Sequence, residues 1–191
     1  MKKNYVRTHD LDWFFIISGK PIHVASVGGD LPKGIKSLKL LREWQKKVEN
    51  ITSRVKVELN RAFIAQQVIQ KDYNYFNDKD FDPDIILQEN DFIKELDYYG
   101  LSVQEKMYYN SFVSMAIRGF YSFDRNLHDE KHETYHIVAK AIHPNKDLLK
   151  MLKEAGVPSI ETNDINLDDD MDQLNNIELV KIIDNIMNSA R

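Results

Sequence analysis

The run Asp12-Trp13-Phe14-Phe15-Ile16-Ile17-Ser18 is followed, after Gly19-Lys20, by Pro21-Ile22-His23-Val24-Ala25-Ser26-Val27. Both runs are rich in aromatic and β-branched residues, which is typical of strands. Glycine at the first of two loop positions predicts a type II′ turn, so that Ile17 would face Ile22 and Phe15 would face Val24. Both faces of this β-hairpin are largely apolar, which indicates a strand pair covered on two sides.

A second pair of strands is expected further along the chain. Residues 120–124 and 134–142 are again aromatic and β-branched, and the polar stretch 126–133 separates them. The sequence therefore predicts two β-hairpins, and we expect them to lie in one small antiparallel sheet.

Helical patterns occupy much of the remaining sequence. Apolar residues recur at helical spacing over 35–71, and the good N-cap residues near 50–53 predict a break there. Asp82-Pro83-Asp84 starts a helix that Gly100 ends, and the capping box Ser102-Val103-Gln104-Glu105 starts another that ends at Gly119. Because only a few residues join these two helices, they should form an antiparallel helix hairpin. A shorter helix is expected over 147–155.

The predicted fold class is α+β: two β-hairpins packed against a helical layer that contains the helix hairpin. Residues 1–156 should form one such domain. Residues 157–172 read as an acidic, loosely ordered connector, because they contain five aspartates and few large apolar residues. Residues 173–191 should form an amphipathic helix that docks on the domain or on a partner, with Ile177, Val180, Ile183 and Ile186 on its apolar stripe.

Composition excludes several function classes. The 191 residues include no cysteine, which rules out disulfides, thiol nucleophiles and cysteine-ligated zinc or iron. No apolar run approaches the ~20 residues of a membrane span, and the start of the chain does not resemble a secretory signal, so we expect a cytoplasmic protein with no membrane association. The net charge of −4 is distributed unevenly, since residues 33–61 carry nine basic residues against three glutamates.

The sharpest motif is His132-Glu133-Thr134-Tyr135-His136, which matches the zinc-hydrolase pattern H-E-x-x-H. On a helix, His132 and His136 would bind the metal, Glu133 would act on its water, and Glu154 is the available third ligand. The motif instead starts in a charged stretch and enters a strand-like run. In a strand its histidines would lie about 13 Å apart, too far to share one zinc ion. We therefore favour a hairpin loop, with zinc catalysis as the alternative.

Three weaker patterns point to other ligands. Asp164-Ile165-Asn166-Leu167-Asp168 resembles a calcium loop but lacks its glycine and its final glutamate. Gly28-Gly29 lies between a strand and a helix, where phosphate can bind, but no phosphate-binding motif surrounds it. His23, His136 and Asp124 are all expected on strands and could perform acid–base chemistry if the fold brought them together.

A basic helix face is the last candidate site. Lys36, Lys39, Arg42, Lys46 and Lys47 lie opposite the apolar stripe of the first helix and could neutralise phosphates, although no nucleic-acid-binding motif accompanies them. Without a complete catalytic or metal site, the sequence favours a cytoplasmic protein-protein interaction module, such as a small inhibitor or immunity-type protein that neutralises another protein. The alternatives are a zinc-dependent hydrolase and a nucleic-acid binder.

Overall fold

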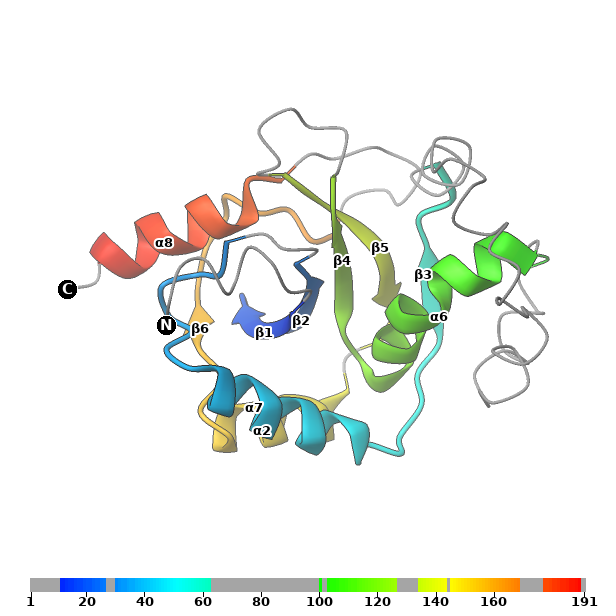
Figure 1. The fold of residues 1–191 in the computed structure, drawn as a ribbon, viewed down its shortest axis with the longest axis horizontal. Coiled ribbons are helices and arrows are strands. Elements are labelled where there is room, and N and C mark those ends of the chain that lie inside the picture. The colour runs from blue at the N-terminus through cyan, green and yellow to red at the C-terminus, as the bar shows by residue number, and fades with distance from the viewer. Residues whose placement is uncertain are drawn as a thin grey trace, which may run out of the picture.

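The computed structural model describes residues 11–26, 30–62, 100, 103–126, 134–143, 145–168 and 177–189. These residues form one curved six-stranded sheet and four helices (Figure 1). The strands are β1 (Asp12–Ile17), β2 (Lys20–Ala25), β3 (Val57–Leu59), β4 (Tyr121–Arg125), β5 (Tyr135–Ala141) and β6 (Ser159–Ile160). The helices are α2 (Leu38–Glu49), α6 (Val103–Arg118), α7 (Lys146–Glu154) and α8 (Leu179–Ser189).

The sheet is mixed, with the strand order β3-β5-β4-β2-β1-β6. The pairs β1–β2, β4–β5 and β3–β5 are antiparallel, whereas β2–β4 and β1–β6 are parallel. The protein is α+β as expected, but the prediction of two hairpins in one small antiparallel sheet is wrong. The β2–β4 pair is parallel because the long connection between these strands returns the chain to the same end of the sheet before β4 begins.

The β1–β2 turn also differs from the expected one. Ile17 pairs with Lys20, so the two loop residues are Ser18 and Gly19, and both have positive φ (48° and 75°). Positive φ at both positions is typical of a type I′ turn, not the type II′ turn expected from the glycine. The pairing is shifted by two residues, so Phe15 lies opposite Ile22. An even shift leaves every side chain on its expected face.

The helical predictions are confirmed in part. Helix α2 ends at Glu49, where the break was expected, but the chain then becomes extended and forms β3; residues 63–71 of the expected helical stretch lie outside the described residues. Helix α6 matches the second half of the expected helix hairpin, and α7 matches the expected short helix. The first half of that hairpin, over 82–99, lies outside the described residues.

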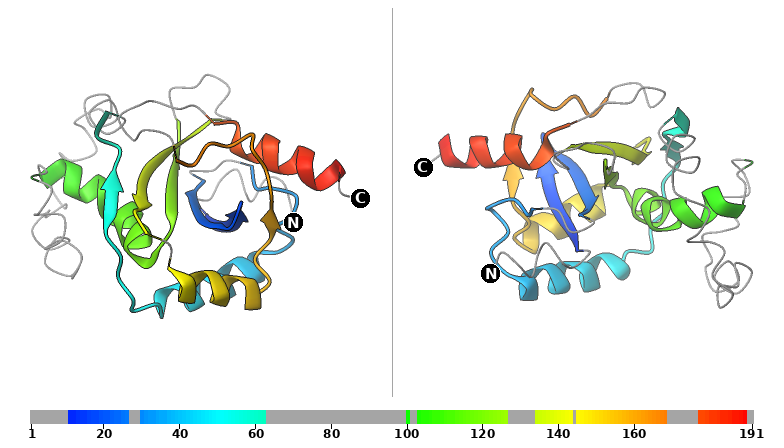
Figure 2. Two further views of the ribbon diagram at one scale, coloured as in Figure 1. Left: turned by 180° about the vertical axis from the view of Figure 1, so that it is seen from behind. Right: turned by 45° about the horizontal axis from the view of Figure 1, so that its top comes forward.

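Helices cover the sheet from several directions. Figures 1 and 2 show α2 and α7 close together along one side and α8 on the opposite side. The indole nitrogen of Trp44 on α2 donates a hydrogen bond to the carbonyl of Ala155, just after α7, at 3.0 Å. Leu41, Trp44, Leu148 and Leu152 join the core that β1 and β2 form, while α6 packs with Val138 and Ala139 of β5 in a second cluster. Each apolar stripe is therefore buried, which fixes the helix orientations.

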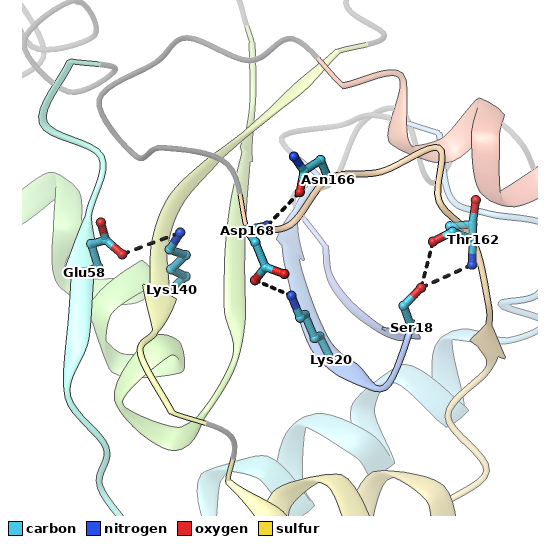
Figure 3. A network of polar contacts seen from close by, with 7 residues as sticks. All are labelled: Ser18, Lys20, Glu58, Lys140, Thr162, Asn166 and Asp168. Atoms are coloured by element: carbon cyan, nitrogen blue, oxygen red, sulfur yellow. Dashed lines mark hydrogen bonds and ion pairs between the residues drawn. The ribbon is translucent and has the colours of Figure 1, made fainter.

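Residues 157–168 lie along the edge of the sheet and are tied to the β1–β2 turn (Figure 3). The Ser18 hydroxyl donates to the carbonyl of Thr162 at 2.8 Å and accepts from its N–H at 3.2 Å, while Lys20 pairs with Asp168. Ile165 and Leu167 are buried in the core. The acidic segment is thus held by contacts with β1, β2 and the core. Whether the chain divides at 157 and 173 remains a prediction.

Helix α8 packs on the rest of the chain. Leu179 and Ile183 are fully buried, and the Asp184 carboxylate accepts a hydrogen bond from the backbone N–H of Lys33 at 2.7 Å. In the described parts of the chain, no helix combines the length and the apolar character that crossing a bilayer requires.

Candidate functional site

Two of the four residues considered for zinc, His136 and Glu154, lie in the described part of the chain. His136 lies on β5 with its side chain buried, so this part of the motif is a strand. Glu154 lies at the exposed end of α7 and pairs with Lys150 at 3.9 Å. His132 and Glu133 lie outside the described residues. Within the described ranges, no three histidine, aspartate or glutamate side chains gather closely enough to hold a metal ion.

The basic residues expected on one helix face are indeed on the surface. Lys39, Arg42, Lys46 and Lys47 are exposed on α2, and Lys36 is exposed just before it. Ser37 caps the helix, since its hydroxyl accepts a hydrogen bond from the N–H of Leu40 at 3.2 Å. Helix α7 lies beside α2 and adds exposed Lys146, Lys150 and Lys153. We call the exposed charged residues of α2 and α7, together with Lys36, the basic face.

Positive charge is also concentrated next to the C-terminal end of α2. Arg54 is exposed there, and its positive charge repels that of Arg118, the last residue of α6. Burial lowers the pKa of Arg118, and repulsion from Arg54 lowers it further, against the attraction of Glu49. Two arginines, Arg54 and Arg118, therefore lie near each other beside the C-terminal end of α2.

Two pairs of buried polar side chains lie in the middle of the sheet. The Nδ1 atom of His23 on β2 lies 2.6 Å from the hydroxyl of Ser122 on β4. In the neighbouring register position, Asp124 of β4 lies opposite His136 of β5. The Tyr108 hydroxyl, on α6, donates to Asp124 at 2.5 Å. The three residues suggested for acid–base chemistry thus belong to two separate pairs, His23 with Ser122 and, two residues further along β4, Asp124 with His136. His23, Asp124 and His136 are at most 4% exposed, so bulk solvent does not reach them.

The pKa of Tyr108 is raised by its surroundings. Burial is the main cause for Tyr108, and the negative charge of Asp124 and their hydrogen bond raise the pKa further above its usual value. The Tyr108 phenol therefore stays protonated and holds the carboxylate of Asp124, which also accepts from the N–H of Arg125 at 2.8 Å. Tyr108 and Asp124 therefore belong to a structural hydrogen-bond network that connects α6 to the sheet.

His23 also lies close to Asp12, which is partly exposed at the surface. The Nε2 atom of His23 lies 3.6 Å from the carboxylate of Asp12, whose side chain is 31% exposed. A hollow of about 250 Å³ opens here between the start of β1 and α2, and both Asp12 and Arg42 line it. Asp12 and Ser122 were not singled out from the sequence. No local pattern could have revealed them, because Ser122 is 99 residues from His23 and a lone aspartate before a strand is common.

Comparison with known proteins adds no family to this fold: no protein-family model, curated protein or solved structure matches the chain.

Proposed function

We propose that this protein is a cytoplasmic protein-protein interaction module that uses the basic face to dock an acidic surface of another protein. A small inhibitor or immunity-type protein, which neutralises its partner by covering it, is the form of this function that we favour. The observation that carries the proposal is the charge of α2 and α7. Their exposed charged residues are seven basic (Lys39, Arg42, Lys46, Lys47, Lys146, Lys150, Lys153) and four acidic (Glu43, Glu49, Asp147, Glu154), in a chain with a net charge of −4.

Most of the basic side chains are available to a partner. Lys39 and Lys150 face Glu43 and Glu154 one turn away, each at 3.9 Å. Among the described residues, Arg42, Lys46, Lys47, Lys146 and Lys153 form no ion pair. Exposed charges of one sign steer an oppositely charged protein toward the surface and set its orientation.

The scaffold under the basic face supports docking without rearrangement. Trp44 is fully buried below α2 and bonds to the carbonyl of Ala155, so the two helices are held at a fixed spacing. The Asn145 side chain caps α7 by accepting from the N–H groups of Asp147 and Leu148. A surface that is ordered before binding loses less conformational entropy when a partner docks.

A folded protein fits this surface better than a nucleic acid does. The acidic side chains Glu43, Glu49, Asp147 and Glu154 are interspersed among the basic ones, and the remainder of the chain has an excess of acidic residues, 26 against 19 basic. An extended polyanion would run from the basic face onto repelling surface, whereas a protein can present a limited acidic patch with matching basic groups.

The test compares two anionic probes on variants with equal net charge. Lys39→Glu/Lys46→Glu reverses two charges of the basic face, and Lys33→Glu/Lys181→Glu reverses two exposed lysines beside and on α8. The probes are a short polyglutamate peptide and a short mixed-sequence DNA duplex at physiological salt. We expect the peptide to bind about tenfold more tightly than the duplex, whose dissociation constant should be about 10⁻⁴ M or weaker. Peptide binding should fall about tenfold in the α2 variant only.

Two results would overturn the proposal. If the duplex binds more tightly than the peptide and depends on Lys39 and Lys46, the basic face is a nucleic-acid site. If neither probe distinguishes the two variants, the basic face is an ordinary solvated surface.

A further inference from the structure

The hollow beside Asp12 is not explained by docking of a protein on the basic face. It is bordered by Leu11 and Asp12 at the start of β1 and by four residues of the facing side of α2, namely Leu38, Leu41, Arg42 and Gln45. Its volume of about 250 Å³ is below the usual range for drug-sized ligands, roughly 300–1,000 Å³, and thus suits a smaller molecule.

The walls of the hollow combine two opposite charges with an apolar surface. The lining residues include one acid, Asp12, one base, Arg42, one amide, Gln45, and three leucines. Among the described residues, Asp12 and Arg42 form no ion pair with each other, and the ionic contact of Asp12 is with His23. Arg42 disfavours a purely cationic ligand and Asp12 disfavours a purely anionic one. A ligand carrying both charges satisfies both walls.

A buried imidazole lies directly behind Asp12. His23 is 1% exposed, its Nδ1 atom is held by Ser122 at 2.6 Å, and its Nε2 atom points toward Asp12 at 3.6 Å. Within the described structure this Nε2 atom has no hydrogen-bond partner.

The ionisation of Asp12 agrees with this arrangement. Burial acts to raise the pKa of Asp12, but the interactions of its carboxylate with the His23 imidazole together outweigh burial, so the pKa is lowered. The carboxylate is therefore charged at neutral pH and able to receive a cationic group from the hollow.

We propose that the hollow between β1 and α2 binds a free α-amino acid with an apolar side chain. Its ammonium group lies against Asp12, its carboxylate against Arg42 and its side chain among Leu11, Leu38 and Leu41. Gln45 provides an amide at the rim for the remaining polar atoms. The site would make this protein responsive to a small metabolite, next to the surface proposed to dock a protein.

The experiment measures binding of three related small molecules to the full chain by isothermal titration calorimetry. The probes are L-leucine, 3-methylbutylamine, which lacks its carboxylate, and 4-methylpentanoate, which lacks its ammonium group. We expect L-leucine to bind with a dissociation constant below about 1 mM, and each singly charged analogue to bind at least about tenfold more weakly.

Variants assign the binding to the hollow. Asp12→Asn and Arg42→Gln should each weaken L-leucine binding about tenfold, since each removes one charged contact. Lys181→Gln, exposed on α8 and outside both the hollow and the basic face, is the control and should bind L-leucine as the parent does. Gln45→Trp should fill the hollow and abolish binding even if Asp12→Asn fails to fold.

Three outcomes would overturn the proposal. The first is no heat of binding for L-leucine up to about 10 mM. The second is an amine or acid that binds as tightly as L-leucine. The third is L-leucine binding that persists in Gln45→Trp. These outcomes are independent of the polyglutamate experiment described above, because the variants used there leave Asp12 and Arg42 unchanged.

Discussion

The side-chain amide nitrogen of Asn145 lies 2.6 Å from the carbonyl oxygen of Arg118, the last residue of α6. The same nitrogen donates to the hydroxyl of Ser53 at 2.7 Å, and the amide oxygen accepts from the N–H groups that begin α7. One buried side chain therefore joins the end of α6, the start of α7 and the extended segment after α2.

Asn145→Ala should lower the free energy of unfolding by about 2–3 kcal/mol, because it removes a helix cap and leaves buried polar groups without partners. Asn145→Ser retains a capping oxygen but loses the donated bonds, so its loss should be intermediate. Urea unfolding monitored by circular dichroism measures both. A loss below about 0.5 kcal/mol for the alanine variant would show that the junction contributes little.

Gly119→Ala should destabilise the same junction through a steric clash. Gly119 has φ +116°, and a Cβ atom there would lie 2.5 Å from the Cβ of Asn145 and 3.2 Å from the Leu148 side chain. We expect a loss of about 2–4 kcal/mol in urea unfolding. Gly19→Ala is the matched control, because a Cβ at Gly19 meets nothing within 4 Å and adds only about 1 kcal/mol of backbone strain. Equal losses in the two variants would contradict this explanation.

Acid should destabilise the protein through Asp12. Its pKa is lowered in the folded state, so the charged carboxylate contributes stability above the ordinary aspartate pKa near 3.9, and that contribution is lost as the pH falls through the lowered value. The stability advantage of the parent over Asp12→Asn should therefore shrink between about pH 5 and pH 2. In a His23→Gln background burial alone acts on the carboxylate and raises its pKa, so the pH dependence should reverse in sign. An advantage that is constant with pH in the parent background would refute this linkage.

Alkaline pH should lower the free energy of unfolding through ionisation of Tyr135. Burial is the main cause that raises its pKa to about 12; Asp30 and Asp124 raise it further and Arg125 lowers it. A raised folded-state pKa contributes stability that is lost as the pH rises above the unfolded value near 10. Relative to Tyr135→Phe, the parent should lose about 1 kcal/mol per pH unit between pH 10 and 12. Parallel stability curves for the two proteins would rule this out.

Zinc content tests the alternative enzyme function. His136 is buried on a strand and Glu154 is exposed and paired with Lys150, so we expect less than about a tenth of an equivalent of zinc per chain purified without a metal-affinity tag. Elemental analysis gives the number. Stoichiometric zinc that is lost in His136→Ala would restore the hydrolase hypothesis and displace the interaction module.

The longer strands of the fold could be predicted from the sequence because each carries its own local signal. Trp13 to Ile17 and the run at Tyr135 are aromatic and β-branched, and their turns contain glycine or polar residues. Strand β3 was missed because Val57 to Leu59 is only three residues long and follows a helical repeat that Val48 and Val55 happen to continue. Strand β6 has two residues and exists only through its pairing with β1.

Neither the direction in which β2 meets β4 nor the candidate ligand site could be predicted, because both depend on contacts between distant segments. Asp12 and Arg42 meet only once α2 has packed on β1, and His23 meets Ser122 only once β4 lies beside β2. Residue types alone revealed the basic face, since solvent-exposed positions on a helix follow from its apolar stripe. Buried polar pairs have no such periodic signal.

The parallel pairing of β2 with β4 also determines when the protein can fold during synthesis. His23 must wait for Ser122, 99 residues later, which takes about 5–20 s at typical translation rates. Over that interval the apolar side chains on both faces of the β1–β2 segment, such as Phe14 on one and Trp13 on the other, have no neighbouring strand to cover them. We therefore expect the nascent chain to expose an aggregation-prone segment until β4 emerges.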